Sequence, residues 1–360
     1  MSSLEFHQIL VGAGQTDAIT NMARAIRNVL QQVGHSEIYA THIAPNVDDI
    51  ESIADFPAAP RRDRVLLFHA SLGDPETFMF LQSRSEPIVL LFHNLSPADY
   101  FESGDPHTAA MLTWGWRELE LLRPRVVWAA ADSQFNADCL REHGYDDLTI
   151  DVIPAGLEVG RYNAIKPDPH TMQMLDAYCD GPLLLFCGQA LAHKRIEQLV
   201  QMQHVLAQYT QLNSTLVVVG PPTNRAIADA FLEQARALAL PRFLALQQVS
   251  DAVLSAVYRR ATVFVSASDH EGLCVPLLEA MACDVPVIAK RVGAIPETVQ
   301  NAGLLVSADA GPIELAEAAI ELSMNKLLRA ELVVRGRERV KEFDVDFTLG
   351  KLVDGLAKVL

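Results

Sequence analysis

Short apolar runs alternate with longer amphipathic segments along the whole chain. Six runs in the first half predict β-strands, at residues 6–12, 37–43, 64–70, 87–94, 125–133 and 149–156. Six more follow in the second half, at residues 182–188, 215–220, 243–249, 262–268, 286–290 and 303–308. Continuous apolar runs separated by helical segments are typical of parallel sheets with helices on both faces. The pattern therefore predicts an α/β protein with two doubly wound halves.

The first amphipathic segment, residues 17–34, predicts a helix because its apolar residues recur with helical spacing. Asp17 can cap its start and Gly34 its end. The proline-bearing stretch 160–170 interrupts the alternation and marks the expected boundary between the halves. We therefore expect a first domain over 1–160, a second over 161–342, and a final amphipathic helix within 343–360.

The composition excludes some classes of protein. The 360 residues are 50% hydrophobic, which allows a large core, and the formal net charge is −16. An acidic chain does not suit general nucleic-acid binding, which needs a basic face. The five cysteines lack zinc-binding spacing and several lie in apolar runs, so we expect reduced, buried thiols. With no leader pattern and no apolar stretch near ~20 residues, we expect a cytoplasmic protein.

Residues that directly follow the strands are candidates for ligand contact, since ligands bind at the carboxyl ends of parallel strands. Gly12 and Gly14 let the backbone approach a ligand closely, but Asp17 stands where a dinucleotide fingerprint needs its third glycine. The pair fits a ligand loop and a plain tight turn equally well. His93 ends an apolar strand, and we favour a functional role for it; for His69, which ends the preceding strand, we favour a structural one.

Three more places stand out in the second half. Gly188 ends a strand, and Lys194 and Arg195 follow where a helix is expected to begin. Lysine at a helix start is electrostatically unfavourable unless an anion or solvent offsets it, and we favour the anion. The loop Val249–Asp251 is a candidate for base binding, although Ser250 or Asp251 also fits a simple helix cap.

Two glutamates eight residues apart carry the strongest chemical signal. Glu271 follows the apolar strand at 262–268, and Pro276 is expected to open a helix with Glu279 in its first turn. The free amides of a helix start suit a phosphate, and carboxylates suit sugar hydroxyls. Taken alone, Glu279 could simply be an acidic residue that is favoured near a helix start by the helix dipole. Taken alone, Glu271 could be an ordinary loop carboxylate. Together they favour a nucleotide-sugar site.

With these residues, the chain resembles the retaining, nucleotide-sugar-dependent glycosyltransferases of family four. The resemblance covers nearly the whole chain and is strongest over HEGLCVPLLEAMACDVPVIAKRVGAIPETVQNAGLLV, residues 270–306. FHNLSPADYF, DSQFNADCLREHG, VIPAGLEVGRYN and the Gly188 to Lys194 spacing support it. It implies the GT-B fold, in which two Rossmann-like domains face a central cleft. The second would be the donor domain, the first the acceptor domain, and the last helix would cross back to the first.

The resemblance also implies residue roles. Glu271 would bind the donor sugar, Glu279 the ribose, and Lys194 would neutralise the diphosphate. The remaining donor contacts would come from a larger set: Gly12, Gly14, Gly188, Gln189, Arg195, Val249, Gly272, Leu273, Cys274 and Val275. His93 would face the donor sugar near the reacting carbon. Gln189 departs from the family, which usually has arginine after the glycine, so Arg195 or His193 would have to supply the missing charge.

The expected reaction needs neither a metal nor a cofactor. The first domain has no Asp-x-Asp after an apolar strand, so Lys194, Arg195 and the helix dipole would stabilise the leaving nucleoside diphosphate. No carboxylate pair resembles the nucleophile and acid of retaining glycosidases, which favours front-face transfer with retention. We expect a hexosyl transfer to a hydroxyl on a glycan, a lipid-linked or a small-molecule acceptor, in glycan or surface-polysaccharide assembly.

Alternatives remain at this stage. One is a GT-B protein that binds nucleotide sugars with weak or no transferase activity, and another is a GT-B phosphorylase or epimerase. An NAD-dependent enzyme is disfavoured by the incomplete glycine fingerprint. Arg61, Arg62 and Arg64 could make a weak peripheral contact with an anionic membrane, although three arginines beside an aspartate also fit a solvated loop.

Overall fold

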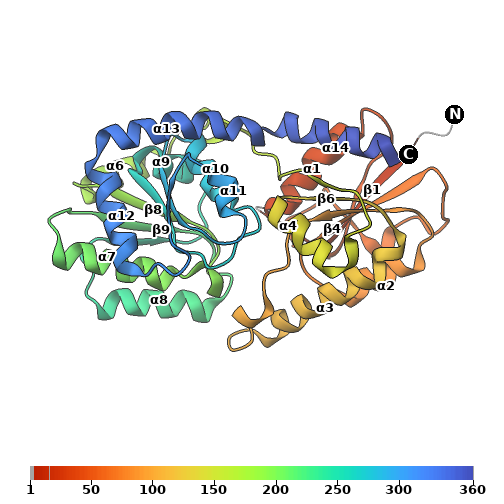
Figure 1. Ribbon diagram of the computed structural model, residues 1–360, viewed down its shortest axis with the longest axis horizontal. Coiled ribbons are helices and arrows are strands. Elements are labelled where there is room, and N and C mark those ends of the chain that lie inside the picture. The colour runs from red at the N-terminus through yellow and green to blue at the C-terminus, as the bar shows by residue number, and fades with distance from the viewer. Residues whose placement is uncertain (1–3, 16, 360) are drawn as a thin grey trace. The chain divides into compact units, whose positions relative to one another are not determined.

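The computed structural model describes residues 4–15 and 17–359, which divide into two compact units (Figure 1). The first unit holds Met1–Gly156 and Val345–Leu360, and the second holds Leu157–Asp344. The expected boundaries at 161 and 343 therefore lie inside the second unit. A physical reason is visible, since the Leu157 amide donates to the Phe343 carbonyl at 2.7 Å. This bond joins the two crossing segments within the second unit.

The first unit contains a parallel sheet in the order β3-β2-β1-β4-β5-β6-β7. Its strands are β1 (Glu5–Ala13), β2 (Ile38–Ile43), β3 (Glu51–Ser52), β4 (Arg64–Ala70), β5 (Ile88–Phe92), β6 (Val126–Ala131) and β7 (Ile150–Val152). All six runs predicted in this half are confirmed as strands. The edge strand β3 was not predicted, because two residues are too few to produce an apolar period.

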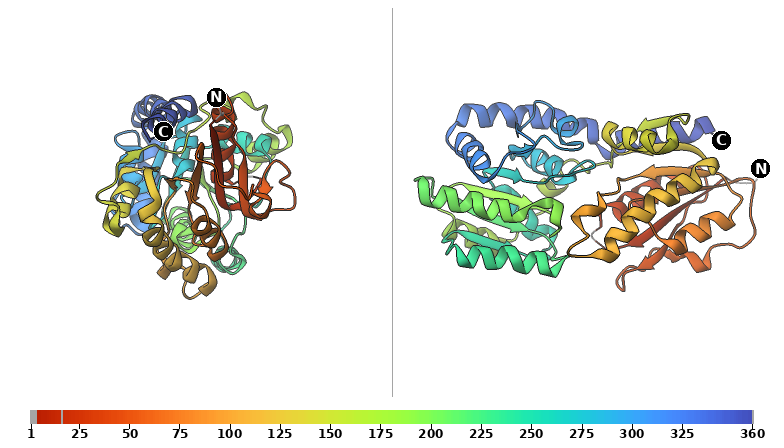
Figure 2. Two further views of the ribbon diagram at one scale, coloured as in Figure 1. Left: turned by 90° about the vertical axis from the view of Figure 1, so that its right-hand side faces the viewer. Right: turned by 60° about the horizontal axis from the view of Figure 1, so that its bottom comes forward.

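Helices cover both faces of this sheet (Figure 2). They are α1 (Ala18–Leu30), α2 (Pro75–Ser83), α3 (Pro106–Leu122), α4 (Gln134–Leu140) and α14 (Val345–Val359). The Asp17 side chain accepts from the Thr20 amide at 2.8 Å, which confirms the predicted cap of α1. The helix ends at Leu30 rather than Gly34. On one face, α1 and α14 contribute Ile26 and Leu352 to a core with the strands.

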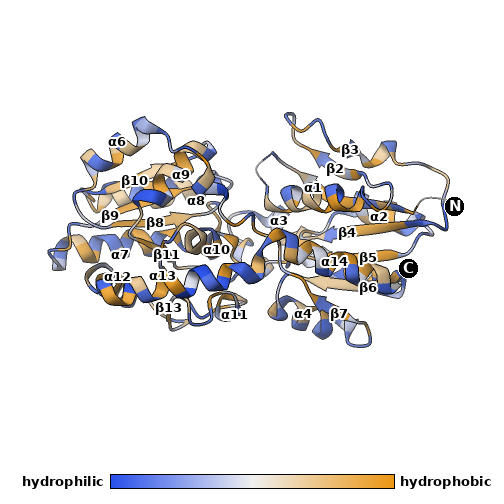
Figure 3. Ribbon diagram, turned by 90° about the horizontal axis from the view of Figure 1, so that it is seen from above, coloured by the Kyte–Doolittle hydropathy of each residue, from blue (hydrophilic) through white to orange (hydrophobic). Residues whose placement is uncertain are grey.

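The second unit contains a parallel sheet in the order β10-β9-β8-β11-β12-β13. Its strands are β8 (Leu183–Cys187), β9 (Thr215–Val219), β10 (Phe243–Leu246), β11 (Val263–Ser266), β12 (Val287–Lys290) and β13 (Leu304–Val306). All six runs predicted in this half are confirmed. Figure 3 shows why the pattern was readable, since strands such as β8 are strongly hydrophobic while the covering helix α13 is largely hydrophilic.

The helices of the second unit alternate with its strands. They are α5 (Arg161–Ala164), α6 (Pro169–Tyr178), α7 (Ile196–Tyr209), α8 (Arg225–Ala237), α9 (Asp251–Arg260), α10 (Val275–Ala282), α11 (Ile295–Val299), α12 (Pro312–Met324) and α13 (Lys326–Val340). A core of strand and helix residues, among them Leu184, Leu199 and Leu315, is fully buried. Across the described part of the chain, no helix combines the length and apolar character that crossing a membrane requires.

The strand order reverses at one place in each sheet. In the first unit this switch point lies between β1 and β4, and in the second between β8 and β11. Open α/β sheets bind ligands beyond the carboxyl ends of the strands at such points. Gly12 and His69 lie near the carboxyl ends of β1 and β4, and Lys194 and Glu271 lie in the segments after β8 and β11; all four were singled out from the sequence.

Candidate active site

An ion pair lies at the switch point of the second unit. Lys194 ends a short 3₁₀ turn (Ala192–Lys194) that follows β8, and Glu271 lies in the loop after β11. The Lys194 Nζ donates to both carboxylate oxygens of Glu271, at 2.8 Å each. The structure thus brings together two residues predicted 77 positions apart.

The pair is largely withdrawn from water. The side chain of Lys194 is 18% exposed and that of Glu271 is 8% exposed. Burial by itself raises the pKa of Glu271, but the charge of Lys194 outweighs it and holds that pKa below its ordinary value. The Ser268 hydroxyl also donates to the carboxylate, at 2.8 Å. Glu271 is therefore an anion whose two oxygens are both held by the one cation of Lys194.

A second cluster of charges adjoins this pair. Arg195 and Lys290 both pair with Asp269, at 2.6 Å and 2.8 Å, and Arg195 also pairs with Glu197. Lys290 ends β12 and is 2% exposed, and among the ion pairs of the described residues it pairs only with Asp269. Sequence reasoning missed it, because it looked like the polar end of an apolar run. The signal was its position at the carboxyl end of a strand.

The structure corrects one expected compensation for Gln189. Gln189 is exposed directly after Gly188, and His193 was one of two residues expected to replace the missing charge. His193 is buried, and burial together with the charge of Lys194 lowers its pKa to about 3. At neutral pH it carries no charge. Arg195 and the unpredicted Lys290 are the cations that remain beside Lys194.

Gly188 follows β8 at a place of close backbone approach. A Cβ on Gly220 would lie 1.9 Å from the Gly188 carbonyl oxygen, and Gly220 also has a φ of 151°. No larger residue fits at Gly220 without moving the Gly188 loop. The backbone at Gly188, a predicted donor contact, is thus closely packed against the backbone at Gly220, in the loop after β9.

The loop Gly272–Cys274 leads into α10, which begins at Val275. Cys274 is buried and adopts a left-handed conformation, with φ 67° and ψ 62°. Pro276 is the second helical residue, which the predicted helix start allows. Glu279 is the fifth, so the prediction that it lies in the first turn was wrong. The helix starts at Val275, one residue before the proline, so Glu279 lies one position further into the helix than expected.

Glu279 is instead held by two tyrosines. The Tyr162 hydroxyl, from α5, donates to its Oε1 at 3.0 Å, and the Tyr258 hydroxyl, from α9, donates to its Oε2 at 3.1 Å. Burial raises the pKa of Glu279, and the two hydroxyls oppose this rise. Neither tyrosine was predicted, because their partner is distant in sequence. Each carboxylate oxygen keeps a lone pair for a further donor.

The predicted base-binding loop lies after β10. The Ser250 hydroxyl accepts from the Val253 amide, so Ser250 caps α9, as one reading of the sequence expected. Asp251 pairs with Arg161 at 2.8 Å. Val249 is half-buried in the loop just before the cap, and its contact with a base stays a prediction.

In the first unit, His93 belongs to a buried chain of side chains. Its Nδ1 lies 2.9 Å from Asp132 Oδ2, and its Nε2 lies 2.9 Å from His69 Nδ1. His69 Nε2 lies 2.9 Å from Gln8 Oε1, and the Gln8 amide nitrogen donates to the Ala23 carbonyl at 2.9 Å. His69, read as structural, and His93, read as functional, are thus members of one network.

The network assigns its protons. Because the Gln8 amide nitrogen donates elsewhere, Gln8 Oε1 accepts from His69 Nε2–H. Burial and then His93 hold the pKa of His69 well below its ordinary value, so its Nδ1 accepts from His93 Nε2–H. One proton therefore lies between His93 and Asp132. Both ring nitrogens of His93 are engaged, and bonding to a sugar would require one of these bonds to be given up.

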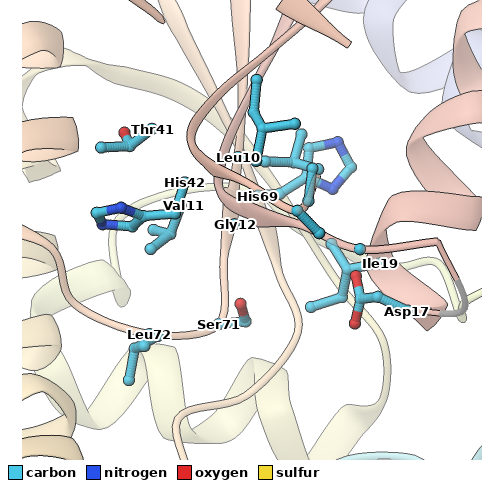
Figure 4. A pocket seen from close by; sticks show the side chains of 14 residues that line it. Leu10, Val11, Gly12, Asp17, Ile19, Thr41, His42, His69, Ser71 and Leu72 are labelled. Atoms are coloured by element: carbon cyan, nitrogen blue, oxygen red, sulfur yellow. The ribbon is translucent and has the colours of Figure 1, made fainter. Parts of the chain in front are cut away.

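A cavity of about 850 Å³ opens at the switch point of the first unit (Figure 4). Its wall includes the predicted Gly12 and Gly14, together with Asp17, His42, His69 and Ser71. The Gly14 amide donates to the Thr20 hydroxyl at 3.1 Å, so this loop is also a turn that feeds the capped start of α1.

The predicted basic cluster is only partly exposed: Arg61 and Arg62 are at the surface and Arg64 is buried. Arg64 is 3% exposed and pairs with Glu5 and Glu86. Arg61 pairs with Glu5 and Asp63. Arg64 is buried because it begins β4 inside the sheet. Of the three arginines, Arg62 alone has no ion pair among those found in the described residues. The described residues of the chain contain no group of three or more side chains that could together hold a metal ion.

The chain is similar in sequence to known glycosyltransferases. The family described as glycosyl transferases group 1 matches residues 181–325. The chain is 30% identical to an alpha-maltose-1-phosphate synthase of Mycolicibacterium smegmatis over 276 residues, which cover 71% of this chain and 69% of that one. It is 32% identical to the O-antigen chain mannosyltransferase B of Escherichia coli over 162 residues, 44% of this chain and 41% of that one.

A solved structure shares the fold across both units. The structure of HepE from Anabaena, in complex with UDP and glucose, superposes with a TM-score of 0.76 at 15% identity, covering 98% of this chain and 99% of that one. The chain belongs to the group 1 glycosyltransferases and has the GT-B fold. It is a glycosyltransferase.

Proposed function

We propose that this enzyme transfers a hexose from a nucleoside-diphosphate sugar to a hydroxyl group, with retention and without a metal or cofactor. The observation that carries the proposal is the Lys194–Glu271 pair at the switch point of the second unit. Lys194 would neutralise the diphosphate and Glu271 would bind the sugar hydroxyls, and the two side chains are directly hydrogen-bonded. The matched family covers this part of the chain.

Donor binding would exchange partners within this pair. Lys194 would turn from Glu271 to the diphosphate, and the released carboxylate would accept hydrogen bonds from the sugar. The nearby charges balance in the free protein, since Lys194, Arg195 and Lys290 face Glu271, Asp269 and Glu197. The diphosphate therefore competes with the protein's own carboxylates. Sugar hydroxyls, which replace the lysine on Glu271, offset part of that cost.

Glu279 would hold the nucleoside. A carboxylate oriented by two tyrosine hydroxyls is set to accept from the two hydroxyls of a ribose. The UDP bound by the Anabaena protein makes a uridine nucleotide the first donor to test. The mannosyltransferase among the relatives makes glycan assembly the first setting to test.

The proposed chemical step uses these residues. The bond between the anomeric carbon and the diphosphate oxygen breaks, and Lys194 stabilises the charge that develops on that oxygen. The acceptor oxygen attacks the same face of the sugar, and its proton passes to the departing phosphate. Configuration is then retained without a protein nucleophile. Positioning of the two substrates supplies much of the rate.

A thermal-shift screen with a panel of nucleotide sugars tests the proposed donor class. A ligand at a hundredfold its Kd adds about 2.7 kcal/mol of stability, which is readily measured. We expect one nucleotide sugar to shift the melting temperature more than its free sugar or the nucleoside. No shift with any member of the panel would contradict the proposal.

A second function is favoured by one observation. Gln189 and the balanced charge cluster leave less positive charge for a leaving diphosphate, which suits a protein that binds nucleotide sugars and transfers them slowly. Release of free nucleoside diphosphate over time, with an acceptor present, separates a transferase from a binding protein.

A further inference from the structure

The cavity of the first unit lies where two helices begin. The helix α1 starts after β1 and α2 starts after β4, the two strands at the switch point. A free helix start is a ready anion site, because its amides and dipole favour negative charge. An anionic substrate in this cavity would be expected to use one of these two starts.

Both helix starts are already occupied by carboxylates of the protein. Asp17 Oδ2 accepts from the amide and the hydroxyl of Thr20, at 2.8 Å each. Asp74 Oδ2 accepts from the amide and the hydroxyl of Thr77, at 2.8 Å and 2.7 Å. Burial raises the pKa of Asp74, but these bonds and His42 outweigh it and lower the pKa, so the carboxylate stays ionised.

The other ionisable groups on the described wall add no net positive charge. His42 Nε2 lies 3.0 Å from Asp74 Oδ1, so a proton or charge on His42 is offset by that carboxylate. His69 has both ring nitrogens engaged in the buried chain and stays neutral. Figure 4 shows Asp17, His42 and Ser71 around the cavity with apolar side chains such as Ile19 and Leu72 between them.

We propose that this cavity takes an uncharged sugar or polyol as the acceptor, rather than a phosphorylated one. The inference rests on the proposed transferase function. Carboxylate, hydroxyl and imidazole groups suit hydroxyl partners, and the apolar side chains suit the faces of a sugar ring. A phosphate monoester would meet the Asp17 carboxylate on the wall and, behind the wall residue His42, the Asp74 carboxylate, each at a helix start that would otherwise bind it.

Matched acceptor pairs test this inference on the intact enzyme. With the donor found in the thermal-shift screen, kcat/KM is measured for glucose against glucose phosphate and for inositol against inositol phosphate. We expect the neutral member of any pair that reacts to be favoured at least about tenfold, the order expected from one repulsive charge contact at short range. Equal or better transfer to the phosphorylated members would overturn the inference.

Variants tie the preference to the two carboxylates. Asparagine caps a helix about as well as aspartate, so Asp17→Asn and Asp74→Asn should fold while removing one charge each. We expect each variant to lower the ratio of kcat/KM for the neutral acceptor to kcat/KM for the phosphorylated one about threefold or more. The change should come from a lower KM for the phosphorylated acceptor. Asp105→Asn is the matched control: Asp105 caps α3 in the same unit and accepts from the Thr108 amide at 3.1 Å, but it is neither on the cavity wall, as Asp17 is, nor bonded to a wall residue, as Asp74 is to His42.

The outcomes separate the inference from the proposed function. A preference that stays unchanged in both Asp17→Asn and Asp74→Asn, or that changes equally in Asp105→Asn, would overturn the assigned cause. Failure of every nucleotide sugar to bind, together with no transfer to either member of any pair, would instead overturn the proposed function.

Discussion

At the scale of single residues, Lys194 and Glu271 depend on each other. Removing the lysine alone, as in Lys194→Met, leaves an uncompensated buried carboxylate, which costs about 3–5 kcal/mol of stability. The same change removes the cation assigned to the diphosphate, so we expect kcat to fall about 100- to 1000-fold. Urea denaturation and steady-state kinetics measure the two effects.

The double variant Lys194→Met/Glu271→Gln separates stability from function. Because it removes both charges, it should recover most of the lost stability while transfer stays low. If the double variant recovered activity along with stability, the pair would be structural and its assignment to the donor would be wrong.

The tyrosines around Glu279 give a prediction with a pH signature. In Tyr162→Phe/Tyr258→Phe, two hydrogen bonds to the ionised carboxylate are lost, so the pKa of Glu279, already raised by burial, rises further. Donor binding that needs the carboxylate is lost as the pH falls through this pKa. We therefore expect binding by the variant to fail at a higher pH than binding by the wild type, in calorimetric titrations with nucleoside diphosphate.

A second readout shows whether the tyrosines act through the ribose. The wild type should bind the ribonucleotide more tightly than its 2′-deoxy form, and the variant should lose part of that discrimination. Equal loss of affinity for both nucleotides, with an unchanged pH profile, would mean that the tyrosines only support the fold.

How far the sequence predicts the site depends on where each partner lies. Glu271 and Lys194 were found because each follows an apolar strand. Lys290, Tyr162 and Asp132 were missed, because their roles arise only from residues distant in sequence. The engagement of both His93 nitrogens, like the neutral state of His193, follows from burial, which a single sequence does not specify.

At the scale of elements, the last helix tests how tightly the first unit is packed. A Cβ on Gly355 of α14 would lie 2.2 Å from Cζ2 of the buried Trp128. We expect Gly355→Ala to destabilise the protein by about 1–3 kcal/mol through overpacking. Chemical denaturation followed by circular dichroism measures the change.

Gly350 lies in the same helix and offers a matched control. A Cβ there would meet no atom within 4 Å. Gly350→Ala should leave stability unchanged or raise it by up to about 1 kcal/mol, because alanine is the better helix former. Equal effects at the two positions would show that helix propensity, rather than contact with Trp128, determines the result.

The elements themselves were largely predictable. Buried parallel strands have long apolar runs, and every predicted run became a strand. The two-residue β3 and the true start of α10 were not predictable, because an edge bridge has no period and a proline tolerates either of the first helical positions. Boundaries shift by such amounts wherever tertiary contacts, such as the Leu157–Phe343 bond, decide them.

At the scale of the whole molecule, the chain has one candidate ligand region in each unit. The charge cluster belongs to the second unit and the 850 Å³ cavity to the first. The charge cluster has the groups that a diphosphate and a sugar require, and the cavity has groups that suit hydroxyls. This division is what a transferase with separate donor and acceptor substrates needs.

The most direct test is a transfer assay with the nucleotide sugar selected by thermal shift and a neutral sugar acceptor, followed by NMR of the product. We predict a new glycosidic bond with the anomeric configuration of the donor, release of one nucleoside diphosphate per bond, and a rate at least about 100-fold lower in Lys194→Met. An inverted product, or a folded Lys194→Met enzyme with an undiminished rate, would contradict the account.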